Sequence, residues 1–225
     1  MENGKTGKPP VGMRIGESIF CIGYLLFAFC AAVILLSGAG DNNLLAGIMV
    51  LLLAAGDSFH LVPRVIRNIR GSLNKSEFYL GLGNLISSVT MTVFYVLMFT
   101  VVRLKTGLSD MSTFDNAVRI SLYILAAIRI ALCFFPANRW FDKEGSLKWG
   151  VIRNVPFVLM GIIMVVWLIH GSIISLWNMY LLAVLIVLSF GFYVPVVLFA
   201  KKKPAVGMLM IPKTICYIVM ICLFL

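Results

Sequence analysis

The sequence predicts an all-α integral membrane protein with seven transmembrane helices, and three observations carry this prediction. The 225 residues are 61% hydrophobic and only 12% charged, whereas soluble domains contain about 25% charged residues. The mean hydropathy is +1.01. Seven apolar runs follow one another with little chain between them, and each is close to the roughly 20 residues that cross a bilayer. We therefore expect one membrane domain over residues 15–225, preceded by a polar, basic tail over residues 1–14.

Charges, prolines and turn residues predict the limits of the spans. The basic flank of the first run is typical of a signal peptide, but the run is longer than the usual apolar region, so we expect an uncleaved helix. The second run ends at Pro63, before a basic segment. Residues 154–200 contain no charge and are too long for one span, so we expect a turn between His170 and Asn178. The expected spans are 18–36, 44–63, 78–102, 118–136, 149–168, 178–200 and 204–225.

The lysines and arginines predict the orientation. The side that receives the loops after spans one, three and five holds only Arg103, Lys105 and Arg119. The side that receives the N-terminal tail and the loops after spans two, four and six holds fourteen basic residues: Lys5, Lys8, Arg14, Arg64, Arg67, Arg70, Lys75, Arg139, Lys143, Lys148, Arg153, Lys201, Lys202 and Lys203. Because cytoplasmic loops are enriched in Lys and Arg, we expect a cytoplasmic N-terminus, an outside C-terminus and a location in the cytoplasmic (inner) membrane. Trp167 and Trp177 are expected at the outer interface, which amphipathic indoles favour.

Several classes of chemistry are not predicted. The net charge of +10 does not indicate nucleic-acid binding, because the basic residues sit in short loops and no nucleic-acid motif is present. The five cysteines fall in apolar runs without CxxC or other ligand spacing, so we expect no disulfide framework. His60 and His170 lie at opposite faces of a bilayer core about 30 Å thick. Walker, nucleophile-elbow and zinc-ligand patterns are absent, so we expect neither a metal nor a cofactor.

Polar side chains inside the spans predict the candidate site. Ionisable residues are costly in a membrane, so each is a functional-site candidate. At about 1.5 Å of rise per residue, these side chains all fall in the cytoplasmic half of their spans. We expect Asp57 and His60 to be catalytic, and five residues to bind the substrate: Ser58, Asn84, Arg129, Tyr193 and Lys213.

Two interpretations of these residues remain open. In the first they line a polar cavity that opens to the cytoplasm, where two cations against one acid leave room for an anion such as a lipid headgroup. In the second, Asp57 pairs with Arg129 or Lys213, and the serines and asparagines join helices by hydrogen bonds. Membrane lipids are the expected partners in the first, and the oligomeric state stays open in both.

Part of the chain resembles a known family. The Gly56-Asp57 pair near the end of a span, followed by Phe78-Tyr79-Leu80-Gly81-Leu82-Gly83 and Tyr95, resembles bacterial lysoplasmalogenase-like membrane proteins over about residues 44–100. The resemblance implies hydrolysis of a vinyl-ether lipid, with Asp57 at the position of the first catalytic acid. The second Ser-Asp pair of that family has no counterpart, because spans five to seven contain no acid.

The leading hypothesis is therefore a lipid-directed hydrolase or a lipid- or amphiphile-binding protein. In a hydrolase, Asp57 would activate water, His60 would assist, and Arg129 or Lys213 would hold an anionic headgroup. One alternative is a small-solute or proton-coupled transporter in which Asp57 couples to protons. A second alternative is a non-catalytic membrane scaffold, so the sequence leaves enzymatic activity open.

Overall fold

The computed structural model describes residues 11–70, 76–107, 113–142, 145–172, 178–200 and 203–225. The regular structure in these ranges is helical, which confirms the predicted all-α class. The long helices are α1 (Val11–Ser37), α2 (Asp41–Arg70), α3 (Ser76–Thr106), α4 (Thr113–Cys133), α5 (Leu147–Ser172), α6 (Met179–Phe199) and α7 (Met210–Cys222). Two 3₁₀ turns, η1 (Pro136–Asn138) and η2 (Pro204–Leu209), precede α5 and α7. In the described part of the chain, seven segments are long and apolar enough to cross a membrane, the last of them combining η2 with α7.

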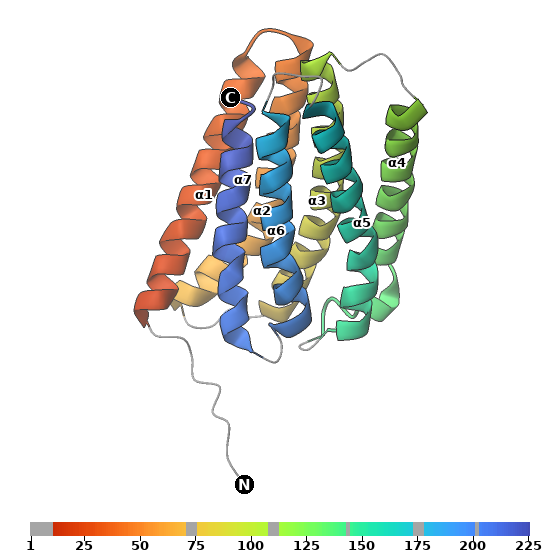
Figure 1. Cartoon of the computed structure of the whole chain (residues 1–225). Helices are drawn as coiled ribbons and strands as arrows, with labels where there is room; N and C mark the ends of the chain where they lie inside the picture. The colour runs from red at the N-terminus through yellow and green to blue at the C-terminus, as the bar shows by residue number, and fades with distance from the viewer. Residues whose placement is uncertain (1–10, 71–75, 108–112, 143–144, 173–177, 201–202) are drawn as a thin grey trace.

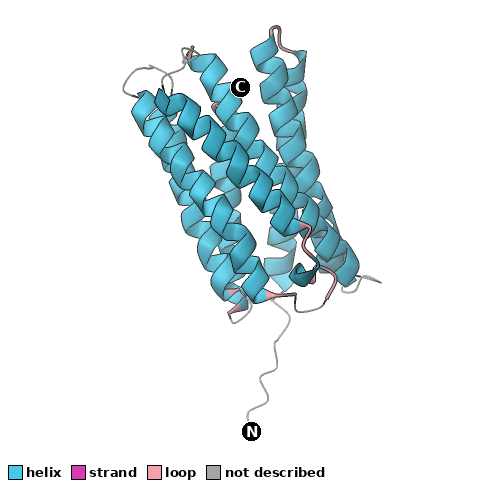
Figure 2. Cartoon of the chain, turned by 90° about the vertical axis from the view of Figure 1, so that its right-hand side faces the viewer, coloured by secondary structure: helices cyan, strands magenta, loops and turns pink. Residues whose placement is uncertain are grey.

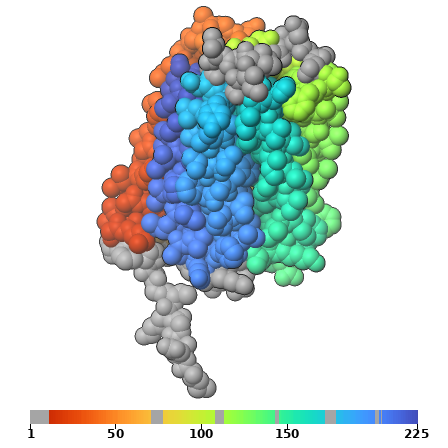
Figure 3. All heavy atoms as spheres, viewed as in Figure 1, coloured from red at the N-terminus to blue at the C-terminus, as the bar shows by residue number. Residues whose placement is uncertain are grey.

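The helices form a ring in the order of the sequence. Each helix packs against the next one, and α7 packs against α1 to close the ring (Figure 1). Figure 2 shows the same bundle from the side, with the helices running along its length. The outer face over α5, α6 and α7 is shown in Figure 3. Because the number of spans is odd, α1 begins at one end of the bundle and α7 finishes at the other.

Most described basic residues lie at the end where α1 begins, which we call the basic end: Arg14, Arg64, Arg67, Arg70, Arg139, Lys148, Arg153 and Lys203. The opposite end carries Arg103, Lys105 and Arg119. The predicted tail over residues 1–14 is shorter than expected, because α1 is already helical from Val11. Parts of these predictions lie outside the described residues, namely residues 1–10, Lys75, Lys143, Trp177, Lys201 and Lys202.

The second helix does not end where the sequence predicted. α2 continues through Pro63 to Arg70. A proline inside a helix removes one backbone donor, so the carbonyl four residues earlier, that of Phe59, loses its helical hydrogen bond. Gly83 of α3 packs against this carbonyl so closely that a Cβ atom at Gly83 would overlap it. The helix thus continues through the proline where the backbones of α2 and α3 approach each other closely.

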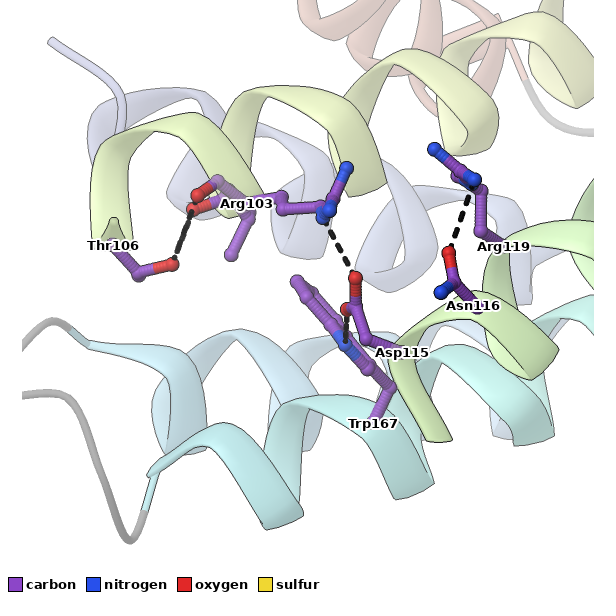
Figure 4. A network of polar contacts seen from close by, with 7 residues as sticks. Arg103, Thr106, Asp115, Asn116, Arg119 and Trp167 are labelled. Carbon is purple, nitrogen blue, oxygen red and sulfur yellow. Dashed lines mark hydrogen bonds and ion pairs between the residues drawn. The ribbon is translucent and has the colours of Figure 1, made fainter. Parts of the chain in front are cut away.

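A polar network joins three helices at the end opposite the basic end, and Trp167 faces inward there. This indole is 2% exposed and donates from Nε1 to Oδ1 of Asp115 over 2.8 Å. Oδ2 of Asp115 pairs with Nε of Arg103 over 2.8 Å. Figure 4 shows the three side chains pointing toward one another from α3, α4 and α5. Trp167 turns inward because the buried carboxylate supplies an acceptor that lipid chains lack.

Candidate functional site

A polar cavity of about 340 Å³ lies inside the ring of helices. It occupies the half of the bundle next to the basic end, because its residues come from the middle of α2, the first half of α3, the first turns of α5 and α7, and the last turns of α4 and α6. Its polar and aromatic lining consists of Asp57, His60, Asn84, Ser87, Ser88, Arg129, Trp140, Arg153, Phe157, Tyr193, Lys213, Thr214 and Tyr217.

Six of the seven residues that the sequence nominated line this one cavity: Asp57, His60, Asn84, Arg129, Tyr193 and Lys213. Ser58 is the exception. Its hydroxyl donates to the backbone carbonyl of Ala55 over 2.6 Å. Successive helical residues point about 100° apart, so the neighbour of Asp57 faces away from the cavity. The structure therefore brings the nominated residues together, while their catalytic or binding roles stay predictions.

The carboxylate of Asp57 is held by two hydroxyl groups. Tyr24 of α1 donates to Oδ2 over 2.8 Å, and Ser87 of α3 donates to Oδ1 over 3.1 Å. The predicted ion pair with Arg129 or Lys213 is absent from the described ion pairs. Hydroxyl donors replace it because α1 and α3 are the two helices that pack on either side of α2.

Arg129 is the most deeply buried cation of the cavity. It is 2% exposed, and its Nε and Nη1 atoms find no hydrogen-bond partner among the described residues. Its Cζ atom lies 3.3 Å from the ring centroid of Phe157. Such stacking stabilises a desolvated cation by about 2 kcal/mol, but removing a charged group from water costs several kcal/mol. The guanidinium therefore lacks a compensating partner, and an anion in the cavity would provide one.

Lys213 is a second buried cation facing the same space. It is 6% exposed, and its Nζ atom lies 4.5 Å from the ring centroid of Tyr217 and 5.3 Å from that of Tyr193. No described ion pair includes it. Aromatic faces satisfy an ammonium group only in part, because its three N–H donors require acceptor atoms. Lys213 adds to the positive charge that faces the cavity.

A third cation, Arg153, is held by the protein itself. Its Nη1 atom donates to Oδ1 of Asn138 over 2.9 Å, and its Cζ atom lies 3.9 Å from the ring centroid of Trp140. Arg153 was expected among the basic loops. Its position about one turn inside the expected span 149–168 was the signal that it could face the interior. Tyr24 was missed as well, although a tyrosine in the middle of an apolar span indicates a polar partner inside the bundle.

His60 borders two cavities. It follows Asp57 by three residues, so both side chains lie on the same face of α2. It also lines a smaller cavity of about 40 Å³ between α1, α2 and α7, where Arg64 pairs with Glu17. The Nδ1 atom of His60 is buried without a hydrogen-bond partner in the described part of the chain. The imidazole therefore borders the polar cavity with one ring nitrogen that has no partner among the described residues.

No group of three or more His, Cys, Asp and Glu side chains in the described ranges lies close enough to hold a metal ion. Comparison of the chain with protein-family models, curated proteins and solved structures finds no match. The resemblance of residues 44–100 to lysoplasmalogenase-like proteins stays a prediction.

Proposed function

We propose that this membrane protein binds an anionic group in its polar cavity, with Arg129 and Lys213 as the main ligands. Arg129 carries the proposal, because a guanidinium that is 2% exposed has two N–H groups without partners among the described residues. Phosphate, sulfate and carboxylate groups accept several hydrogen bonds at once and match the forked donors of arginine. The anion is either a free ion or the headgroup of a lipid.

The positive-inside rule supports a cytoplasmic origin for this anion. The cavity lies next to the basic end, and basic ends of membrane proteins face the cytoplasm. We therefore propose that the anion enters from the cytoplasm or from the inner leaflet. An alkaline phosphatase domain fused after Leu225 should be active, and a fluorescent protein that folds only in the cytoplasm should stay dark there. The reverse pattern would contradict this orientation.

The carboxylate of Asp57 favours a second function built on the same cavity. Because hydroxyl groups hold Asp57, it can change its charge without breaking an ion pair. With His60 beside it, this acid would serve either as the general base of a hydrolase or as the proton carrier of a transporter. Replacing Asp57 by Asn separates the two uses. A hydrolase would lose turnover and keep ligand binding, whereas a proton-coupled transporter would keep exchange and lose gradient-driven uptake.

Thermal unfolding of the purified protein tests anion binding. Inorganic phosphate and dodecyl phosphate are added separately to delipidated protein in a nonionic detergent at constant ionic strength. An anion present at about 100 times its Kd stabilises the folded state by about 2.7 kcal/mol, which raises the Tm of a chain of this size by roughly 5–10 °C. We expect this rise in the wild type and in Lys148→Met, whose side chain is exposed at the basic end.

The variants Lys213→Met and Arg129→Met should lose most of this response, because each removes one of the two buried cations. Methionine retains the length of the side chain and removes its charge. The proposal fails if neither phosphate compound raises the Tm of the wild type, or if both cavity variants respond as the wild type does.

A further inference from the structure

A second cavity, of about 230 Å³, lies between α5 and α6 and is almost entirely apolar. It is lined by Val151, Asn154, Val155, Val158, Leu159, Val194 and Leu198, together with two residues that border the polar cavity. Tyr193 and Val197 of α6 line both spaces. The apolar groove, as we call this cavity, therefore shares two lining side chains with the polar cavity.

The groove lies where both helices carry a proline, Pro156 in α5 and Pro195 in α6. A proline inside a helix removes a backbone hydrogen bond and favours bending, so both helices can bend at the level of the groove. The groove opens to the outside of the bundle, because Val155 and Leu159 at its rim are 51% and 43% exposed. In a membrane, this outside is occupied by lipid chains.

The polar atoms at the border are already satisfied. The hydroxyl of Tyr193 donates to Oδ1 of Asn154 over 2.8 Å, and Nδ2 of Asn154 donates to the carbonyl of Gly150 over 2.7 Å. Among the described residues the groove thus presents an almost entirely apolar wall, while Arg129, whose Nε and Nη1 atoms lack hydrogen-bond partners there, lines the polar cavity. One side of Tyr193 suits an alkyl chain and the other side suits an anion.

We infer that the ligand is an anionic amphiphile, whose hydrocarbon chain occupies the apolar groove while its headgroup passes Tyr193 to reach Arg129 and Lys213. This inference rests on the proposed anion site and names the class of molecule that it takes. A small hydrophilic anion would use the polar cavity alone. An amphiphile uses both spaces, because its two ends differ in polarity as the two cavities do.

The test compares inorganic phosphate with dodecyl phosphate, which share a headgroup chemistry and differ in the chain. The Kd of each is measured by native mass spectrometry at a fixed concentration of nonionic detergent. Val194 lines the apolar groove and not the polar cavity, so Val194→Trp fills the groove while Arg129 and Lys213 stay unchanged. Val187→Trp is the matched control: it lies two turns away on the same face of α6, is 54% exposed and lines neither cavity.

We expect Val194→Trp to weaken dodecyl phosphate binding by about tenfold or more, because the chain loses its buried apolar surface. It should leave the Kd of inorganic phosphate unchanged, and Val187→Trp should change neither. Lys213→Met should weaken both ligands. The inference is overturned, and the anion site stands, if inorganic phosphate binds as tightly as dodecyl phosphate or if Val194→Trp affects neither. If neither ligand binds the wild type, the anion site itself fails and the inference fails with it.

Discussion

Replacing Arg129 by methionine measures the free-energy cost of its unpaired charge. The change removes a desolvation cost of several kcal/mol and a stacking contact with Phe157 worth about 2 kcal/mol, while methionine fills most of the same space. The desolvation cost exceeds the stacking energy, because two guanidinium N–H groups have no partner among the described residues. We expect the ligand-free variant to be more stable than the wild type by about 1–3 kcal/mol, which raises the Tm by roughly 2–4 °C for each kcal/mol.

The assay is thermal unfolding of delipidated protein in a nonionic detergent, with and without saturating dodecyl phosphate. Without the anion, Arg129→Met should have the higher Tm. With the anion, the order should reverse, because only the wild type gains the full binding free energy. Arg67→Met serves as the control, since Arg67 is exposed at the basic end and a surface substitution changes the stability by less than about 0.5 kcal/mol.

A lower Tm of ligand-free Arg129→Met would refute the reasoning. It would mean that the protein alone stabilises the guanidinium, so no anion is required in the cavity. The variant could instead have the higher Tm both without a ligand and with either dodecyl phosphate or inorganic phosphate. That result would support an unpaired charge on Arg129, but it would refute a phosphate-like anion as its partner.

Two further variants test the packing around the cavity and at the opposite end. Asp115→Asn leaves the half-buried Arg103 without its carboxylate, so we expect a loss of about 3 kcal/mol in the free energy of unfolding, measured as a lower Tm; an unchanged Tm would show that the ion pair contributes nothing. Gly56→Ala places a Cβ atom into Thr90 of α3 and should lower the stability by about 1–3 kcal/mol. In Gly23→Ala the new Cβ atom meets no atom within 4 Å, so this control should be neutral or gain up to about 1 kcal/mol from helix propensity. Equal effects of the two alanines would contradict the close approach of α2 and α3.

Local properties of the chain determined the fold class and the candidate residues. The number of spans follows from the length of the apolar runs, because a helix must satisfy its backbone across the whole bilayer. Arg129 and Lys213 could be nominated from the sequence, since a charge inside an apolar run is costly wherever the helix packs. Their depth followed from the rise per residue, which places them in the same half of the bundle as Asp57.

Helix limits were less predictable from the sequence. Pro63 is a local signal for the end of a helix, yet α2 continues through it. The carbonyl that the proline leaves without a donor lies against Gly83 of a different helix. A rule based on neighbouring residues contains no information about that contact.

Only the tertiary structure decided which side chains meet. Asp57 is bonded to Tyr24 and Ser87 rather than to a cation, because the ring of helices brings α1 and α3 against its face of α2. Trp167 turns inward to Asp115 because α4 packs against α5. Helical periodicity states which residues share a face, but which faces meet depends on the packing of the whole ring. That packing determines the hydrogen-bond partners of Asp57. It also leaves two nitrogens of Arg129 without a hydrogen-bond partner among the described residues and forms the apolar groove between α5 and α6.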